Sequence, residues 1–394
     1  MGYDFTTLPN RRGVGSAKWN AMLEAKPDVC EAAVPLSVAD MEFMNPPEVI
    51  EGLKRFLDTA VLGYTMPTDA YYDAVISWMK RKKHWDVSRE EIVCSPGVIP
   101  TLYAAVRAFT KPGDPVLLMT PAYPPFYAAV RENGRCVVTS SLINTGDHYE
   151  VDFEDMERKI EENQIHMLFL CNPQNPTGHA WKYEELVRLG EMCLKHDVLV
   201  LSDEIHSDLM MPGVTHTVFA QIREDFADRC LVCTAPSKTF NLAGMQTSNI
   251  MIHNPELRER FTKELATSGG GSMLNILGYE ACRIAYNECE AWLEELISVV
   301  WENHLYLEEF MKREMPKAKV YRMEGTYLQW VDLNAYHLSI EEQQQINEQQ
   351  AEAFLDEGYI FGVEGNGYER INLACPKWVL EQTLERMAKA YKDL

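Results

Sequence analysis

The fold is decided by the segment Met167-Leu168-Phe169-Leu170-Cys171-Asn172-Pro173-Gln174-Asn175-Pro176-Thr177-Gly178. It begins with five apolar residues, the length of a buried strand, and continues with seven residues rich in Asn, Pro and Gly, which favour turns. A polar loop directly after a buried strand lies where open parallel sheets bind their ligands, beyond the carboxyl ends of the strands. The segment therefore predicts a strand of a central sheet and part of a binding site.

Short apolar runs recur on both sides of this segment and alternate with amphipathic stretches. The predicted strands are 91–94, 115–119, 136–140, 167–171, 198–202, 230–234 and 248–253. Between several of them lie helical patterns, such as the apolar face of Ile99, Leu102, Tyr103, Val106 and Phe109. This alternation predicts an α/β fold with a mostly parallel central sheet of about seven strands, covered by helices on both faces.

After this series the pattern changes to long, charged helices, which predicts a smaller α+β domain. One helix is expected over 293–312 and another at the end of the chain, with strands at 327–333 and 369–374 between them. The stretch 341–350, rich in Gln and Glu, is interpreted as the solvated face of a helix. We predict an N-terminal segment 1–47 that joins the small domain, a large domain 48–288 and a small C-terminal domain 289–394.

The charge balance argues against polyanionic partners. The 394 residues include 37 basic and 59 acidic ones, a net charge of −22, so neither nucleic acid nor a membrane surface is an expected partner. No run approaches the ~18 apolar residues of a spanning helix, and no signal-peptide pattern opens the chain, so a cytoplasmic protein is expected. The ten cysteines show neither disulfide nor metal-ligand spacing, so we expect reduced thiols and no metal.

Polar clusters follow five of the predicted strands in regular order. They are Ser95-Pro96-Gly97-Val98-Ile99, Thr120-Pro121-Ala122-Tyr123, Asn172 to Gly178, Asp203-Glu204-Ile205-His206 and Ser237-Lys238-Thr239-Phe240-Asn241. Each cluster alone is explained by a loop, a turn or a helix cap. One cluster per crossover predicts instead a single site, assembled at the carboxyl edge of the sheet.

The last three of these clusters, together with Arg370-Ile371-Asn372, resemble the class I/II aminotransferase superfamily of pyridoxal 5'-phosphate (PLP) enzymes, which have fold type I. The resemblance extends from about residue 10 to the end of the chain. It is closest to the cystathionine β-lyase or cysteine-S-conjugate β-lyase branch. The residues that carry the branch resemblance are Ser16-Ala17-Lys18-Trp19, Val38-Ala39-Asp40-Met41-Glu42-Phe43, Gly63-Tyr64 and Ser237 to Gly244.

The resemblance implies PLP as the cofactor and gives several residues a role in the chemistry. Lys238 would hold the PLP aldehyde as a Schiff base, the internal aldimine, and move the proton at the substrate Cα. Asp203 would keep the pyridine nitrogen protonated, and Asn175 and His206 would lie near the 3-hydroxyl group. Arg370 would bind the substrate carboxylate, for which a planar two-pronged donor is suited.

The resemblance also implies how an acidic chain holds the anionic cofactor. Backbone N–H groups of Gly97, Val98 and Ile99 at a helix start would bind the phosphate without net positive charge. Ser237 would add a hydroxyl contact, and Tyr64 would reach across from a neighbouring subunit of a homodimer. Tyr123 would stack on the pyridine ring.

The function implied is β-elimination from a thioether amino acid, such as cystathionine or a cysteine conjugate, giving a thiol, pyruvate and ammonia. The alternative is an aminotransferase, because the two reactions share all of these cofactor contacts. A PLP-binding regulator is a further alternative, although the −22 charge opposes DNA contact. Two residues depart from the family pattern, Ser37 and Glu42, and the resemblance places both near the substrate mouth.

Overall fold

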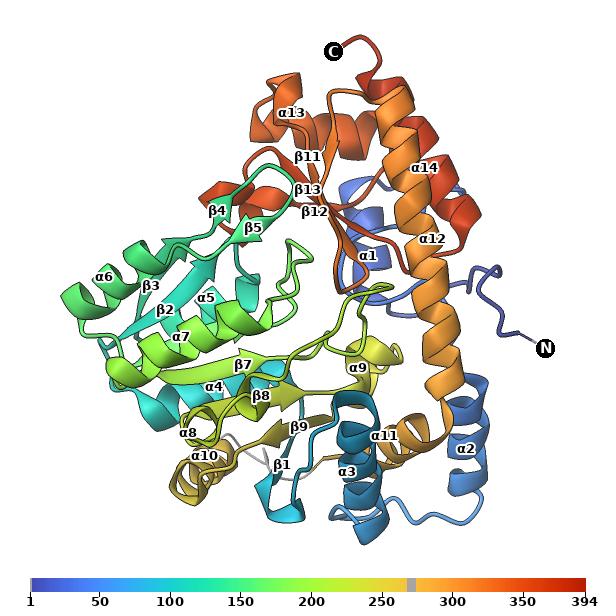
Figure 1. The fold of residues 1–394 in the computed structure, drawn as a ribbon. Coiled ribbons are helices and arrows are strands. Elements are labelled where there is room, and N and C mark those ends of the chain that lie inside the picture. The colour runs from blue at the N-terminus through green and yellow to red at the C-terminus, as the bar shows by residue number, and fades with distance from the viewer. Residues whose placement is uncertain (1, 268–273) are drawn as a thin grey trace.

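The computed structural model describes residues 2–267 and 274–394. Its centre is a seven-stranded sheet in the order β1-β9-β8-β7-β6-β2-β3 (Figure 1). The strands are β1 (Ile92–Ser95), β2 (Pro115–Thr120), β3 (Cys136–Ser141), β6 (Met167–Cys171), β7 (Leu199–Asp203), β8 (Cys230–Thr234) and β9 (Ser248–Met251). Only β9 runs opposite to its neighbours, antiparallel to β1 and β8. The predicted α/β fold with a mostly parallel sheet is confirmed.

Helices cover both faces of this sheet because successive strand side chains point to opposite sides. On one side, Phe169 belongs to a core that includes residues of α4 (Val98–Phe109), α5 (Pro124–Arg131) and α10 (Pro255–Thr267). On the other side, Leu168 belongs to a core that includes residues of α6 (Phe153–Asn163) and α7 (Tyr183–Lys195). The inner strands β6, β7 and β8 are therefore buried on both faces, which explains their largely apolar sequences.

The C-terminal part forms a second, antiparallel sheet in the order β10-β11-β13-β12. Its strands are β10 (Lys319–Val320), β11 (Leu328–Asp332), β12 (Asp356–Glu357) and β13 (Tyr368–Asn372), and β4 (Ile143–Asn144) pairs with β5 (Tyr149–Glu150) in a separate hairpin. The predicted strands 327–333 and 369–374 correspond to β11 and β13. The two-residue strands were not predicted, since two residues show no periodicity.

The long helix α12 (Glu290–Glu314) extends from α2 (Pro47–Leu57) to the second sheet, where it lies beside α14 (Lys377–Tyr391) (Figure 1). The remaining helices are α1 (Ala17–Ala25), α3 (Asp69–Lys83), α8 (Glu224–Ala227), α9 (Pro236–Thr239), α11 (Ile276–Glu288) and α13 (Ile340–Gln344). Among the described helices, none combines the length and apolar character that crossing a bilayer requires.

The interpretation of 341–350 as a solvated face is wrong for part of that stretch. The helix α13 continues as a π-helix over Gln345–Gln350, and Gln343 and Asn347 are buried. Both side-chain amides donate to Glu369 Oε1 at 2.8 Å. Their polar side chains point inward because a buried carboxylate needs donors there.

Candidate active site

The carboxyl ends of the parallel strands border a cavity of about 210 Å³. Nine of the predicted site residues line it: Gly97, Val98, Ile99, Tyr123, Asn175, Asp203, His206, Ser237 and Lys238. They come from five separate segments, each at the carboxyl end of a parallel strand of the central sheet. The cavity is therefore the place where the polar clusters of the sequence meet.

Lys238 lies on the short helix α9, directly after β8, and its side chain is half-buried against the cavity. Its Nζ donates a hydrogen bond to the carbonyl oxygen of Ala39 at 2.8 Å. Burial, followed by the positive charge of Arg370, lowers the pKa of Lys238 to about 8. Near neutral pH a useful fraction of this amine is consequently uncharged and able to accept a proton.

Asp203 and His206 supply a carboxyl and a neutral imidazole to the same cavity. Burial raises the pKa of Asp203 to about 7, and its Oδ1 accepts a hydrogen bond from the Ile205 N–H at 3.2 Å. Burial, with the charges of Lys238 and Arg370, holds the pKa of His206 well below its usual range. His206 Nδ1 is buried without a hydrogen-bond partner in the described chain. Both groups suit a polar ring that offers a cationic N–H and a hydroxyl.

The opposite end of the cavity is built from a helix start and hydroxyl groups. Gly97 precedes α4 with φ of 146°, a backbone conformation that favours glycine. Ser237 lines this cavity together with Gln246, Thr247 and Ser248, three residues that were not predicted. Ser248 Oγ is buried without a partner in the described residues.

The reason that these last residues escaped prediction is the direction of β9. Because β9 is antiparallel to β8 and β1, its first residue, Ser248, lies at the ligand edge. In a parallel sheet, the expected ligand contacts are residues that follow strands. A reversed strand brings the residues that precede it to the same edge.

Arg370 lies behind the cavity, on β13, and is 4% exposed. Its Nη1 donates to Asn175 Oδ1 at 2.7 Å, so it contacts a residue that lines the cavity. Its Nε and Nη2 donate to Asp356 Oδ2 at 3.1 and 2.5 Å. Asp356 was not predicted. It stands opposite Arg370 in the β12–β13 pair, and β12 has only two residues.

Tyr64 does not lie at the cavity of its own chain. Its side chain is 100% exposed, in a segment where Val61 is 84% and Met66 is 68% exposed. It is the only predicted site residue that the single chain leaves apart from the others.

The segment that contains Ser37 and Glu42 reaches the cavity at Ala39. Neither residue lines the cavity. Glu42 is 1% exposed, and its Oε1 accepts from Lys18 Nζ at 2.8 Å and from Arg11 Nη1 at 2.6 Å. Its carboxylate is oriented inward by these two cations.

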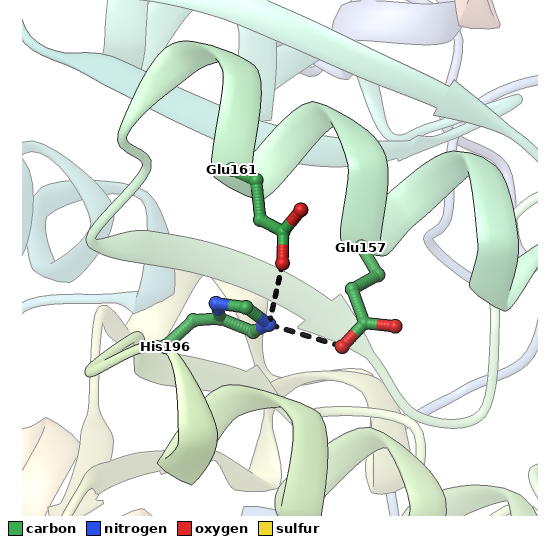
Figure 2. Close-up of side chains that lie close together, drawn as sticks. All are labelled: Glu157, Glu161 and His196. Atoms are coloured by element: carbon green, nitrogen blue, oxygen red, sulfur yellow. Dashed lines mark hydrogen bonds and ion pairs between the residues drawn. The ribbon is translucent and has the colours of Figure 1, made fainter.

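A second polar cluster joins α6 to the end of α7 (Figure 2). His196 Nε2 lies 3.0 Å from Glu157 Oε1 and 3.7 Å from Glu161 Oε1. Lys195 Nζ also contacts Glu157 Oε1, at 2.8 Å. Cations near a helix C-terminus are favourable, so we interpret this group as an ion-pair network between two helices.

The family model for aminotransferase class I and II matches residues 31–387. The chain belongs to this family. Among curated members, cystathionine beta-lyase PatB of Bacillus subtilis is 41% identical over 98% of this chain and 99% of that protein. Among solved structures of the family, cystalysin from Treponema denticola, which contains a pyridoxal 5'-phosphate cofactor, has a TM-score of 0.98 and 46% identity over 100% of both chains.

A third member, the PLP-bound C-S lyase from Staphylococcus hominis, has a TM-score of 0.91 and 32% identity over 99% of this chain and 98% of that one. The aminotransferase class I and II assignment and the branch resemblance inferred from the sequence motifs are thus confirmed. The match with PatB extends beyond the family model to nearly the whole chain, which includes most of the N-terminal segment.

Proposed function

We propose that this protein is a PLP-dependent carbon–sulfur β-lyase that cleaves L-cystathionine or related cysteine S-conjugates to a thiol, pyruvate and ammonia. The observation that carries the proposal is the Lys238 amine, whose pKa is about 8, at a cavity that also contains Asp203 and His206. The near full-length similarity to PatB and to two structurally characterised relatives supports the choice of lyase.

The residues around the cavity fit PLP. Asp203, whose buried carboxyl has a raised pKa, would ionise opposite a protonated pyridine nitrogen. His206 Nδ1, which has no partner in the described chain, and Asn175 would lie near the 3-hydroxyl. Tyr123 would cover one face of the ring.

The residues at the end of the cavity near Gly97 fit the phosphate group of PLP as well, although the chain is acidic overall. The amides at Gly97, Val98 and Ile99 and the hydroxyls of Ser237 and Ser248 would bind the phosphate. Backbone amides and hydroxyls are fixed donors, so no net positive charge is required there.

When bound, PLP withdraws the electron pair left at the substrate Cα, which makes the Cα proton acidic and allows a β-substituent to depart. The chain supplies the rest. Arg370 orients the substrate by its carboxylate, and the uncharged Lys238 amine accepts the Cα proton. Because Arg370 is held by hydrogen bonds before substrate binds, this residue needs little reorganisation.

The lyase and the aminotransferase differ in one assay. With cystathionine and no keto acid, we expect steady release of pyruvate over many turnovers, measured by coupling to lactate dehydrogenase. An aminotransferase would instead stop after one turnover, with the cofactor absorbance shifted to that of pyridoxamine phosphate, and this result would contradict the proposal. Steady-state comparison of cystathionine, cystine and S-methylcysteine would then rank the thioethers as substrates.

We also propose that the protein is a homodimer in which Tyr64 completes the partner's site. Tyr64 is fully exposed, and apolar neighbours such as Val61 and Met66 surround it in sequence. Exposed apolar groups of this kind suit a protein interface. The cavity of one chain is lined by Tyr123 and not by Tyr64, so a contact from Tyr64 would come from a second copy.

Tyr64→Phe is expected to weaken PLP binding by about tenfold, because one hydrogen bond to a charged phosphate is lost. Retention of the cofactor after dilution, followed by absorbance, measures the effect. Tyr183→Phe, at another exposed tyrosine, is the matched control and should retain PLP as the wild type does. Unchanged retention in Tyr64→Phe, or a monomer by light scattering, would contradict the contact across subunits.

The predicted division of the chain becomes part of this proposal. Residues 48–288 would carry the cofactor, and residues 289–394 would bring Arg370 over the substrate. The N-terminal segment would join the small domain, which is supported by hydrogen bonds from Leu36 N to Phe354 O and from Asn372 N to Leu36 O, both 2.9 Å. A cytoplasmic location is proposed because the ten cysteines are free, as in reducing compartments.

A further inference from the structure

Two N-terminal segments of the branch resemblance, 16–19 and 38–43, pack against each other. Lys18 is completely buried, and its Nζ lies 2.9 Å from Asp40 Oδ1 and 2.8 Å from Glu42 Oε1. The same Nζ donates to the backbone oxygen of Asp40 at 2.9 Å. An ammonium group has three N–H donors, and all three are engaged by this short segment.

Arg11 completes a cluster of two cations and two carboxylates. Its Nη2 lies 2.7 Å from Asp40 Oδ2 and its Nη1 lies 2.6 Å from Glu42 Oε1. We name Arg11, Lys18, Asp40 and Glu42 the four-charge cluster. Formal charges within it cancel, and removing one partner of a buried pair leaves an uncompensated charge. The cluster therefore fixes its backbone tightly.

The backbone held by the four-charge cluster contacts the Lys238 amine directly. The carbonyl oxygen of Ala39, the residue before Asp40, accepts hydrogen bonds from Lys238 Nζ at 2.8 Å and from Tyr327 OH at 2.9 Å. Asn372 Nδ2 donates to Asp40 O, in the next peptide, at 2.7 Å, so two consecutive carbonyl groups of this segment accept hydrogen bonds. Because the Ala39 carbonyl is held in place, the Lys238 amine that donates to it is held in one direction.

The same segment also reaches the carboxylate-binding residue. The N–H of Val38 donates to Asp356 Oδ2 at 2.9 Å, and this oxygen also accepts from Arg370. Val38 adopts φ of 55°, an uncommon conformation for a β-branched residue. Residues 38–40 thus form a short backbone bridge between Lys238 and Arg370.

We propose that the four-charge cluster is a positioning device for the lyase reaction. It holds the Ala39 carbonyl so that the Lys238 amine, whenever it is free of the cofactor, is aimed for proton transfer at the substrate Cα. Lys18 and Glu42 act as positioning residues, because they reach the amine only through the backbone. This inference rests on the proposed function.

Lys18→Met removes the cation and its three hydrogen bonds and should lower kcat by about tenfold with KM changed less than twofold. A second readout is the pH midpoint of the visible absorbance of the covalently bound cofactor. The charged groups that act on Lys238 are Arg370, Asp40, Asp203 and Asp356. Without the positive charge of Lys18, the negative charge of Asp40 acts more strongly on Lys238. The pH midpoint of the absorbance should therefore rise by about 0.5 pH units.

The double variant Lys18→Met/Glu42→Gln restores the charge balance and tests the hydrogen bonds even if the single variant is unstable. Its absorbance midpoint should return toward the wild-type value while kcat stays low. Lys26→Gln is the matched control, since Lys26 follows the same helix α1 and pairs with Glu352 at 3.1 Å. Kcat and midpoint should be unchanged in this control.

Three results would overturn the inference: an unmoved midpoint with normal kcat in Lys18→Met, recovery of kcat in the double variant, or an equal loss in the control. Wild-type pyruvate release is measured alongside. If the wild type released none, the proposed function would fail, while the midpoint shift would still report on the cluster.

Discussion

Lys238→Ala is expected to lose at least about 10⁴-fold in kcat/KM for cystathionine, because under the proposed function one amine would both attach the cofactor and move the Cα proton. The protein should also lose the yellow absorbance of covalently attached PLP. The lowered pKa of about 8 leaves Lys238 suited to both tasks, and alanine at this position supports neither.

The measurement combines pyruvate release with an absorbance spectrum of the purified variant. Lys54→Ala, at an exposed lysine on α2, is the control and should match the wild type in both. A Lys238→Ala protein that keeps the absorbance band and turns over at the wild-type rate would show that another group carries the chemistry.

Arg370→Lys is expected to lower kcat/KM for cystathionine by about 10²-fold or more, because an ammonium group cannot offer a planar pair of donors. The positive charge is retained, so any loss of activity reports on the arrangement of the hydrogen-bond donors. Lysine offers three donors on a single nitrogen, so it cannot reproduce the planar contacts of the guanidinium with Asp356 and Asn175. Steady-state kinetics give the effect, and the cofactor absorbance should be preserved.

Arg322→Lys, at a mostly exposed arginine paired with Glu324, provides the control for this substitution. Its kinetics should equal those of the wild type. If Arg370→Lys retained full kcat/KM, the substrate carboxylate would have to be bound elsewhere.

Much of the site could be predicted because its polar residues stand at the ends of buried strands, and the sequence shows both the apolar runs and the polar residues that follow them. Asp203 and Lys238 follow apolar runs directly, and the parallel arrangement of β6, β7 and β8 brings their loops together. The rule that ligands bind beyond the carboxyl ends of strands therefore located residues that are far apart in the chain.

The residues that were missed do not follow a predicted strand. Ser248 precedes its strand, and Asp356 lies on a strand of two residues. Ala39 contributes a backbone carbonyl, an atom that every residue possesses. The contacts of Glu42 with Lys18 and Arg11, more than 20 residues away in sequence, were also missed, because such pairings follow from tertiary packing alone.

The hydrogen bonds of Arg370 have a stereochemical consequence. A guanidinium has five N–H donors, and within the described chain three of them are engaged, by Asp356 and Asn175. The other two N–H groups, one on Nη1 and one on Nη2, are left for a ligand. Under the proposed function, these two donors would hold the substrate carboxylate, and Lys238 would accept the Cα proton. With a contact to the amino group there would be three points of attachment, which distinguish mirror images, so the chirality of the accepted amino acid would be set before any bond breaks.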